Sequence, residues 1–338
     1  MTRTFSTLCA FAFALLMTTT SSQAQTAQRT FVSTTGSDAN NVGLCSAANP
    51  CRSFGVALGV TNTNGEIIAL TSGGYGAVTI TKGVQITAPT GVYAAITASS
   101  GDGITVAAGS IDVVVLRGLT LNGLSGASEG IDFDTGGALH IENCAINGFG
   151  SRGILFDAAG ELFIKDTIVR NGGVGIFITA SSGTARASID HCRIENNSGA
   201  GVFVNAGGEV TVNDSLAAGN IGSGFLVQAT GKLTTYRCVS ATNSNGFRLI
   251  GGGEMIVESC IARGNTNVGM LAEGTGTVMR VSNSTAVQSA TGFEQSGSAN
   301  FRSRGNNTVE GNDADVRQYP RVLRHLAHSD QPWEVPKC

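Results

Sequence analysis

Proline is nearly missing from the middle of this 338-residue chain. All five prolines lie outside residues 90–319. Every backbone N–H of a stacked β-structure must enter a hydrogen-bonded ladder, and proline has no N–H to donate. A proline-free stretch of this length therefore favours a continuous ladder of strands.

Charged residues are also scarce, at 13% of the chain, and the net charge is only −3. No basic cluster is present, so the electrostatic footprint of a nucleic-acid binder is missing. Long apolar runs are lacking too. The run at residues 8–17 is shorter than the roughly 20 residues that span a bilayer, so we expect no membrane span.

That short apolar run fits a secretory signal peptide. Arg3 precedes it, and a polar stretch ending in Ser22 and Ala24 follows it. A basic start, an apolar centre and a small-x-small exit predict cleavage after Ala24. The mature product is expected to be secreted or periplasmic. In that oxidising setting Cys45 and Cys51, in one turn-rich segment, are expected to form a disulfide.

Self-similarity at intervals of about 23 residues dominates the middle of the chain. Each copy holds one strand pattern that ends in a small residue and a second that opens with glycine. The first pattern ends at Cys144, Thr167, Cys192, Ser215, Cys238, Cys260 and Ser284. The second opens at Gly130, Gly153, Gly175, Gly201, Gly224, Gly246 and Gly269. Two alternating strands per copy, with no helical period, favour a β-helix over a leucine-rich repeat.

We therefore predict an all-β protein, a single-stranded right-handed parallel β-helix (solenoid) of roughly ten coils with a short N-terminal capping helix. The expected organisation is a signal peptide at 1–24, an N-terminal cap at 25–64, the parallel β-helix at 65–312 and a C-terminal tail or cap at 313–338. Ser53 is predicted to cap the short helix, which carries Phe54, Ala57 and Leu58.

These repeats resemble the right-handed parallel β-helix repeat family of the pectate-lyase-like superfamily, over residues 31–312. Residues 32–38 and 49–54 are similar to the N-terminal cap of many secreted β-helix proteins. The family includes lyases, hydrolases, phage tailspikes and proteins without known activity, so the resemblance implies the fold and leaves the chemistry open.

Residues 189–192, Ile-Asp-His-Cys, resemble a pectate-lyase segment in which the Asp helps bind calcium. The Arg-x-Pro-x-x-Arg base motif of those lyases is missing. The paired-Asp and Gly-His-Gly motifs of polygalacturonases are missing as well.

Two ladders of small or amide side chains are assigned to structure rather than to chemistry. Cys144, Cys192 and Cys238 are separated by coils that carry Thr or Ser, so their sulfurs should lie about 9–10 Å apart, too far for a zinc site. Cys238 and Cys260 lie on adjacent coils and could bridge, and Cys338 has no evident partner. The predicted amide ladder consists of Asn171, Asn196, Asn220, Asn243 and Asn265.

Two groups of carboxylates are weak candidates for catalysis. Asp132, Asp134 and Asp157 should fall near one another, and a spacing of about 5 Å suits a calcium site or a retaining pair of carboxylates.

In the second group Asp166, His191 and Asp214 share one column, with Asp190 beside His191. Asp166 and Asp214 should lie about 9–10 Å apart, near the upper limit for an inverting pair. For both groups we favour solvated turn residues over a site, and no metal is assigned with confidence.

An outward column of the glycine-initiated strands carries four consecutive large apolar residues, Leu155, Phe177, Phe203 and Leu226. The whole column reads Thr105, Asp132, Leu155, Phe177, Phe203, Leu226, Arg248, Leu271 and Glu294. Such a stripe facing solvent is unusual for a monomer. It could be covered by the C-terminal tail, take part in self-association or partner binding, or stack on a polysaccharide.

Three functional hypotheses follow. The first is a non-catalytic exported β-helix that binds a glycan or another cell-surface component along its coils, because solenoids offer long rigid surfaces. The second is a polysaccharide lyase or glycoside hydrolase that uses one of the acidic groups, with calcium as the cofactor those carboxylates would suit. The third is a structural or assembly role through the apolar stripe.

Overall fold

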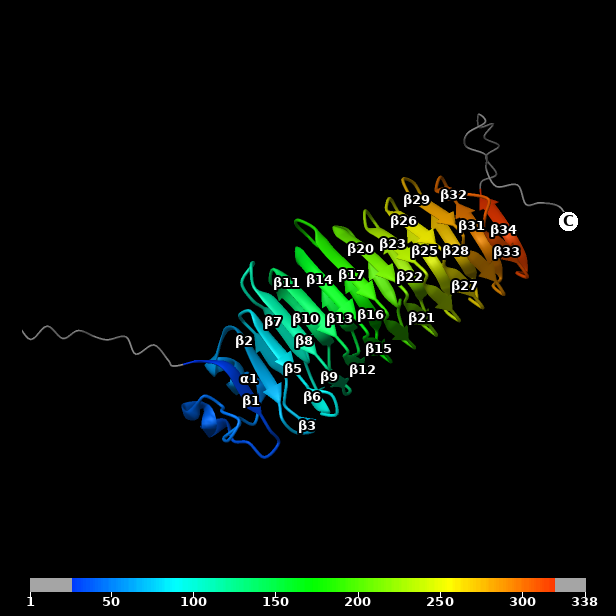
Figure 1. Ribbon diagram of the computed structural model, residues 1–338. Coiled ribbons are helices and arrows are strands. Elements are labelled where there is room, and N and C mark those ends of the chain that lie inside the picture. The colour runs from blue at the N-terminus through cyan, green and yellow to red at the C-terminus, as the bar shows by residue number, and fades with distance from the viewer. Residues whose placement is uncertain (1–25, 320–338) are drawn as a thin grey trace, which may run out of the picture.

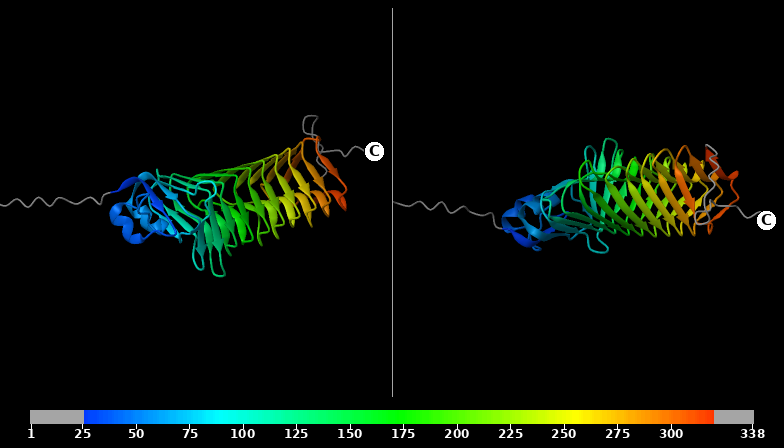
Figure 2. Two further views of the ribbon diagram at one scale, coloured as in Figure 1. Left: turned by 60° about the horizontal axis from the view of Figure 1, so that its bottom comes forward. Right: turned by 90° about the horizontal axis from the view of Figure 1, so that it is seen from above.

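The computed structural model describes residues 26–319, and these form a parallel β-helix of three sheets (Figure 1). Figure 2 shows the coils stacked along one axis, with the helical cap at the N-terminal end. The predicted fold class is thus confirmed. The signal peptide predicted at 1–24, the residues after 319 and Cys338 lie outside the described residues. No helix between residues 26 and 319 is long and apolar enough to cross a membrane.

Sheet A contains twelve parallel strands in the order of the chain. They are β1 (Ala27–Val32), β2 (Thr61–Ala69), β5 (Val84–Thr87), β8 (Val113–Arg117), β11 (Ala138–Glu142), β14 (Gly160–Lys165), β17 (Ala185–Asp190), β20 (Gly208–Asn213), β23 (Lys232–Tyr236), β26 (Glu254–Glu258), β29 (Val278–Ser282) and β32 (Asn300–Ser303).

Sheet B follows sheet A in each coil and contains eleven strands, most of them three residues long. They are β3 (Gly73–Gly74), β6 (Ala94–Ala98), β9 (Leu119–Gly123), β12 (Ala145–Asn147), β15 (Ile168–Arg170), β18 (Arg193–Glu195), β21 (Leu216–Ala218), β24 (Val239–Ala241), β27 (Ile261–Arg263), β30 (Thr285–Val287) and β33 (Thr308–Glu310). The sequence predicted two strands per coil and missed this sheet, because three residues are too few to show an alternation.

Sheet C closes the coil with another eleven strands, which gives eleven coils where the sequence predicted roughly ten. They are β4 (Val78–Ile80), β7 (Ile104–Ala107), β10 (Glu129–Thr135), β13 (Arg152–Phe156), β16 (Val174–Ile178), β19 (Val202–Val204), β22 (Ser223–Gln228), β25 (Asn245–Ile250), β28 (Val268–Glu273), β31 (Thr291–Ser296) and β34 (Ala314–Tyr319). The last of these continues the ladder after residue 312.

The N-terminal cap covers the first coil with a short 3-10 helix, η1 (Asp38–Gly43), and the helix α1 (Phe54–Val60). Ser53 caps α1 by accepting a hydrogen bond from the Val56 N–H, and α1 buries Phe54, Ala57 and Leu58, as predicted. A disulfide joins Cys45 and Cys51, the pair that the sequence analysis expected to bridge.

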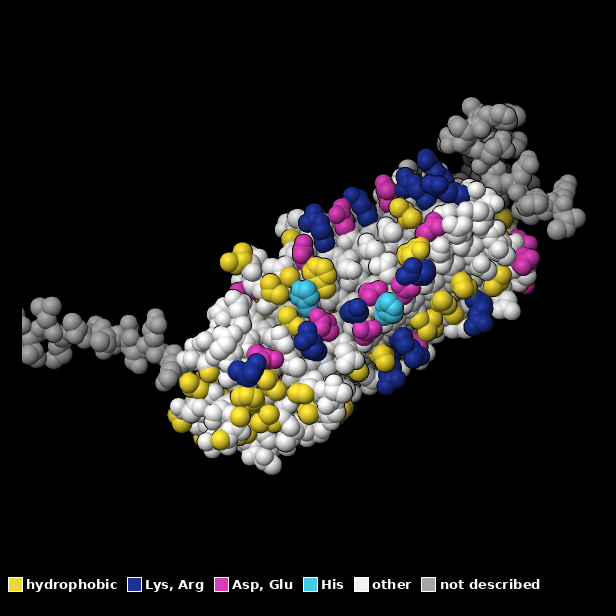
Figure 3. All heavy atoms as spheres, in the orientation of Figure 1, with side chains coloured by type: hydrophobic (Ala, Val, Ile, Leu, Met, Phe, Trp, Pro, Cys, Tyr) yellow, Lys and Arg dark blue, Asp and Glu magenta, His cyan; other side chains and the backbone are white. Residues whose placement is uncertain are grey.

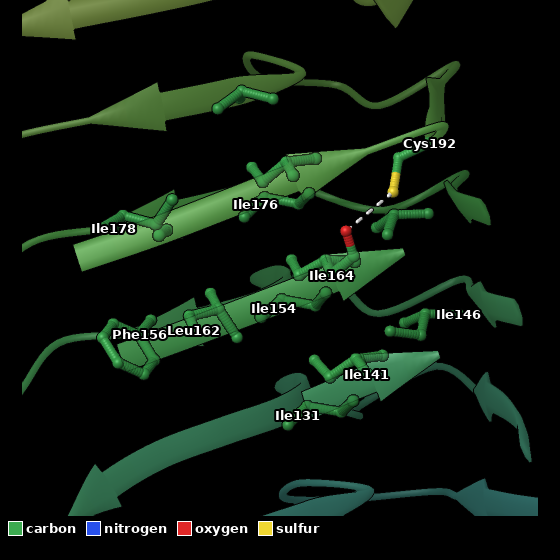
Figure 4. Packing of buried hydrophobic residues seen from close by; sticks show 14 of the residues in the cluster. Ile131, Ile141, Ile146, Ile154, Phe156, Leu162, Ile164, Ile176, Ile178 and Cys192 are labelled. Atoms are coloured by element: carbon green, nitrogen blue, oxygen red, sulfur yellow. Dashed lines mark hydrogen bonds between the residues drawn. The ribbon is translucent and has the colours of Figure 1, made fainter. Parts of the chain in front are cut away.

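Strict alternation along each strand separates the inside of the coil from its surface. Inward side chains stack on their counterparts one coil away, as Ile131, Ile154 and Ile176 do in sheet C (Figure 4). Charged side chains of both signs are spread over the outside (Figure 3). The interior is therefore a continuous apolar column, and the outer faces of the sheets are where binding chemistry can lie.

The bend between sheets A and B explains the ladder of small residues. Its first residue has a positive φ in coil after coil: Asn143, Asp166, His191, Asp214, Arg237, Ser259 and Asn283. The small residue that follows points inward and caps the preceding coil. The Cys192 N–H donates to Ser215 Oγ and the Cys260 N–H to Ser284 Oγ, each over 3.0 Å. Cys238 and Cys260 are buried free thiols.

The amide ladder exists, but the prediction was wrong for two of its members. Asn171 and Asn196 are exposed, and Asn197 instead takes the interior position. That position comes five residues after the small residue of the bend, as in Cys192 and Asn197, whereas the predicted ladder included asparagines at a spacing of either four or five. Asn197, Asn220 and Asn243 each donate their backbone N–H to the side-chain oxygen of the next asparagine, over 2.9–3.1 Å.

Candidate functional site

The outer face of sheet A is hollowed over four successive strands, β14, β17, β20 and β23. The hollow has a volume of about 510 Å³ and is open to solvent. Its floor is a column of hydroxyl side chains, Ser188, Thr211 and Thr234, which are neighbours in the sheet register. We call this region the sheet A hollow.

A stacked pair of aromatic side chains, which we call the aromatic step, closes one end of the sheet A hollow. Phe163 stands next to Ser188 in the register, and 38% of its surface is exposed. Its ring stacks on the ring of His140 one coil earlier, with centroids 4.6 Å apart and an interplanar angle of 18°. The step arises because two bulky outward residues are followed by three small ones in the same column. A flat ligand in the hollow would therefore contact the face of the Phe163 ring at one end and the row of hydroxyl side chains beyond it.

A column of alternating charge runs along one side of the sheet A hollow. Glu161, Arg186, Glu209 and Lys232 pair in register, and Lys232 Nζ lies 2.9 Å from Glu209 Oε1. Arg186 Nε lies 3.8 Å from Glu209 Oε2. The hydrogen bond from Lys232 lowers the pKa of Glu209. These two acidic and two basic side chains balance in charge, so the hollow has no strong field of either sign.

The first predicted acidic group does assemble on sheet C. Oxygens of Asp132, Asp134 and Asp157 all lie within 4.8 Å of one another. Asp132 is half-buried on β10, and its Oδ1 is buried without a hydrogen-bond partner among residues 26–319. Burial and the charges of the neighbouring carboxylates, Asp134 first, raise the pKa of Asp132 to about 7. Burial and Asp134 also raise the pKa of Asp157.

Three carboxylates at this separation allow two kinds of chemistry. A proton shared near neutral pH suits general acid–base catalysis, and carboxyl groups about 5 Å apart match the spacing of a retaining glycosidase pair. The same oxygens would provide part of the oxygen shell that Ca²⁺ requires. The arrangement fits a calcium ion in donor type, and Asp132, Asp134 and Asp157 would hold it.

The second predicted group is only partly assembled, and its charges are already satisfied. Ligand atoms of Asp190, His191 and Asp214 lie within 4.8 Å of one another, and Asp166 is outside this group. Asp214 forms a two-pronged ion pair with Arg237, which lowers its pKa. The hydrogen bond between Nδ1 of His191 and Asp190, 2.9 Å long, raises the pKa of His191.

His191 and Asp214 have positive φ angles of 51° and 47°, as the bend requires. Asp and Asn tolerate that conformation better than most residues, and His shares this tolerance. This group is therefore explained by the turn.

The register of the predicted apolar column is confirmed on the outer face of sheet C. Asp132, Leu155, Phe177 and Phe203 are successive neighbours in the ladder, and Leu226 follows Phe203. The column is less exposed than the sequence suggested, since only 9% of the surface of Leu155 is accessible. Each large side chain is packed between its neighbours one coil away, and Arg152 lies over Phe177 at 5.0 Å from the ring centroid.

The sequence analysis missed the sheet A hollow. The outward positions of sheet A were available from the repeat, because they alternate with the inward residues of the same strands. Ser188, Thr211 and Thr234 carried no chemical signal of their own. Only a comparison of side-chain size along the column, from His140 through Phe163 to Thr234, could have located the step.

Comparisons with known proteins agree with this architecture. The sequence matches the family described as a right-handed β-helix region over three overlapping segments, residues 82–240, 129–286 and 182–314. No curated protein matches the sequence. The crystal structure of the pectate lyase Pel9A is similar, with a TM-score of 0.53 and 16% sequence identity, over 86% of this chain and 80% of that chain. At that identity the similarity shows the fold alone. Since the matched segments together span more than half of the sequence, the chain belongs to the right-handed β-helix family.

Proposed function

We propose that this protein is an exported, non-catalytic β-helix that binds a neutral glycan in the sheet A hollow. The observation that carries the proposal is the stacked pair His140 and Phe163 beside a row of hydroxyl groups. Export is supported by the signal-like start of the sequence and by the disulfide between Cys45 and Cys51.

The side chains of the sheet A hollow match the two surfaces of a sugar. An aromatic ring offers a flat apolar face for the C–H face of a pyranose. Ser188, Thr211 and Thr234 each offer one donor and two acceptors, which suits the hydroxyls at the edge of the ring. At about 4.8 Å per strand, these three positions extend roughly 10 Å, about the length of two sugar residues.

The balance of charge indicates which glycans fit. Glu209 is paired with both Lys232 and Arg186, so neither sign is free to attract an acidic or basic ligand. A polyanion would have to break these pairs and approach Glu161 as well. A neutral glycan makes no such demand, because its hydroxyls can bond to the paired groups as they stand.

A binding panel with one matched control tests this function. The full chain is titrated calorimetrically with neutral and acidic oligosaccharides, with and without calcium, while the products are checked for cleavage. Phe163→Ala is expected to weaken binding of a neutral oligosaccharide about tenfold, since the ring is the one aromatic face among the described residues that line the hollow, and aromatic residues are enriched among those that contribute most to binding. The control is Ile256→Ala, which lies in the same column, has 37% exposure and is outside the hollow.

Ile256→Ala should bind as the unmodified chain does. Equal weakening by both substitutions would contradict the proposal, as would a panel in which no neutral glycan binds.

The acidic group on sheet C favours a second candidate function, a polysaccharide lyase or glycoside hydrolase. The supporting observation is the pKa of about 7 for Asp132, whose carboxylate lies within 4.8 Å of those of Asp134 and Asp157. If this function is correct, the same panel releases new chain ends. Asp134→Asn would then lower the rate at least about 100-fold, as loss of a general acid or base does.

A further inference from the structure

Two polar atoms stand out among the buried side chains of residues 26–319. Asp132 Oδ1 and Arg248 Nε are the only buried side-chain atoms there without a hydrogen-bond partner. Both residues belong to the outward column of sheet C, on β10 and β25. They sit at the two ends of the apolar stripe, which comprises Leu155, Phe177, Phe203 and Leu226.

The two ends carry opposite and incompletely paired charges. The carboxylate of Asp132 accepts no hydrogen bond from the described residues and forms no ion pair with them. Arg248 uses one nitrogen, Nη2, in an ion pair with Glu273 at 2.9 Å. Five strand spacings, about 24 Å, separate Asp132 from Arg248. The four side chains of the stripe carry no charge, and the guanidinium of Arg152 lies over one of them, Phe177, at 5.0 Å from the ring centroid.

This order of residues is self-complementary under a two-fold rotation. We propose that the outer face of sheet C binds a second copy of this chain in an antiparallel, isologous arrangement, with the two-fold axis between Phe177 and Phe203. The rotation places Phe177 against the partner's Phe203 and Leu155 against the partner's Leu226. It also places Asp132 beside the partner's Arg248, and the reverse contact forms at the other end.

No other simple alignment of two stripes satisfies both charges. A side-by-side parallel copy would face Asp132 with the partner's Asp132 and Arg248 with the partner's Arg248, and such like-charge contacts are costly. A shift of one coil would bring Asp132 against the partner's Leu226 and leave its charge buried against an apolar group. The isologous contact also closes on itself, so it yields a dimer and no fibre.

The strands beside the stripe support the same surface. Ala200, Ser223 and Val268, each three positions before the column residue of its own coil, are buried and uncharged, so they add no charge beside the column. Another acid of β10, Glu129, forms an ion pair with Arg152 at 2.8 Å. A second copy therefore meets an apolar centre with the acidic group of Asp132, Asp134 and Asp157 at one end and the ion pair of Arg248 and Glu273 at the other, which is the pattern of an interface core with a polar rim. This dimer leaves the sheet A hollow open and does not depend on the proposed glycan binding.

Charge reversal with reciprocal mixing tests the dimer. The mass of the full chain is followed by light scattering over a range of concentrations at pH 8, above the raised pKa of Asp132, so that its carboxylate is charged. The unmodified chain is expected to reach twice the mass of one chain. Asp132→Lys alone and Arg248→Glu alone should each raise the dissociation constant about 100-fold or more, because each creates two like-charge contacts per dimer. An equimolar mixture of the two variants should recover the dimer, with one native pair and one reversed pair.

Two further variants keep the test decisive if either reversal folds poorly. Phe203→Glu puts a charge at the two-fold axis, away from the acidic group, and should give monomers of unchanged circular dichroism. Arg280→Glu, a reversal on the outer face of sheet A, is the control and should leave the mass unchanged. A monomeric unmodified chain at its highest soluble concentration would overturn the proposal, and so would reversal variants that associate as tightly as the unmodified chain. Failure of the mixture to recover, with both variants folded, would overturn it too.

Discussion

The outer faces of sheets A and C are built from the same coils in the same register, yet their charged side chains are arranged in different ways. On sheet A a column of charges alternates in sign, and Glu209 pairs with both Arg186 and Lys232. On sheet C four coils carry large apolar side chains between Asp132 and Arg248, and each of these two has an unpartnered atom. Sheet A pairs these charges within one chain, whereas on sheet C the carboxylate of Asp132 has no cationic partner among the described residues and Arg248 uses only Nη2 in its ion pair with Glu273.

The difference shows that the polarity and charge of a face in a parallel β-helix are set separately for each column of side chains. Neighbouring positions along the axis are about 4.8 Å apart, so each side chain interacts mainly with its counterparts one coil away. Opposite charges placed one coil apart neutralise each other at once. Opposite charges placed five coils apart cannot do so, and under the proposed dimer they would pair with a second copy instead.

The largest effect expected from this comparison concerns stability. Phe177→Ser together with Phe203→Ser should lower the free energy of unfolding by about 2–3 kcal/mol, because both rings are half-buried and pack at 4.7 Å between centroids. Phe163→Ser on sheet A, where the ring is more exposed, should cost about 1 kcal/mol or less. Urea unfolding at a concentration where the chain is monomeric measures both. Equal losses on the two faces would remove the distinction between them.

A smaller effect should depend on pH. The pKa of Asp132 is raised from the ordinary value of 3.8 to about 7, so the folded state holds this proton more firmly than the unfolded chain does. Its contribution to stability is complete below pH 3.8 and is lost as pH rises through about 7.

Asp132→Asn should therefore stabilise the monomer at pH 8, by roughly 1–2 kcal/mol after allowance for solvent screening, and should have little effect near pH 3. Unfolding curves at the two pH values measure this difference. A benefit of the same size at both would show that the charge is not its cause.

The smallest effect is expected from the ion pairs of sheet A. Lys232→Met should leave the free energy of unfolding unchanged within the error of the measurement, because exposed pairs of this kind contribute little and are screened by salt. Unfolding in low and high salt, with Arg280→Met as a second exposed pair, provides the measurement. A clear loss of stability that disappears in high salt would mean that the charges of sheet A are structural and not merely balanced.

Much of the fold could be predicted from the sequence, because the repeat imposes the same inward and outward pattern on every coil. The column from Thr105 to Glu294 was read in its correct register for that reason. Sheet B was missed because its strands are three residues long. Asn171 and Asn196 were misplaced because one residue more or less between two bends moves an amide from the interior to the surface.

The candidate site was less predictable. The proximity of Asp132, Asp134 and Asp157 followed from their spacing, but the raised pKa of Asp132 depends on how the adjacent coils bury it. The sheet A hollow arises from a drop in side-chain size between Phe163 and Ser188, two residues that carry no catalytic signature. Prediction of the hollow would have required the change in side-chain size from one coil to the next, which the chemistry of any single strand does not reveal.

The two proposals for sheet C also bear on each other. An antiparallel dimer would bury Asp132 against the partner's Arg248. Acid–base chemistry at Asp132 would then be restricted to the monomer, whereas glycan binding on sheet A would be the same in both states. Measurement of polysaccharide turnover against protein concentration separates these outcomes.

The hydrogen bonds at the bends between strands run in one direction along the stack, from each coil to the coil that follows it. The Asn197 N–H needs the side chain of Asn220, and the Cys192 N–H needs that of Ser215, so each coil is completed by the coil made after it. A chain that emerges N-terminus first during synthesis or export would therefore always end in a coil whose bend still lacks these hydrogen bonds. The next coil would form on that edge. Asp315 ends this series by accepting from the Asn312 N–H with its own carboxylate. Without the Asp315 carboxylate, the bend of the last coil would open first. Unfolding would then proceed from the C-terminal coil towards the N-terminus, one coil at a time.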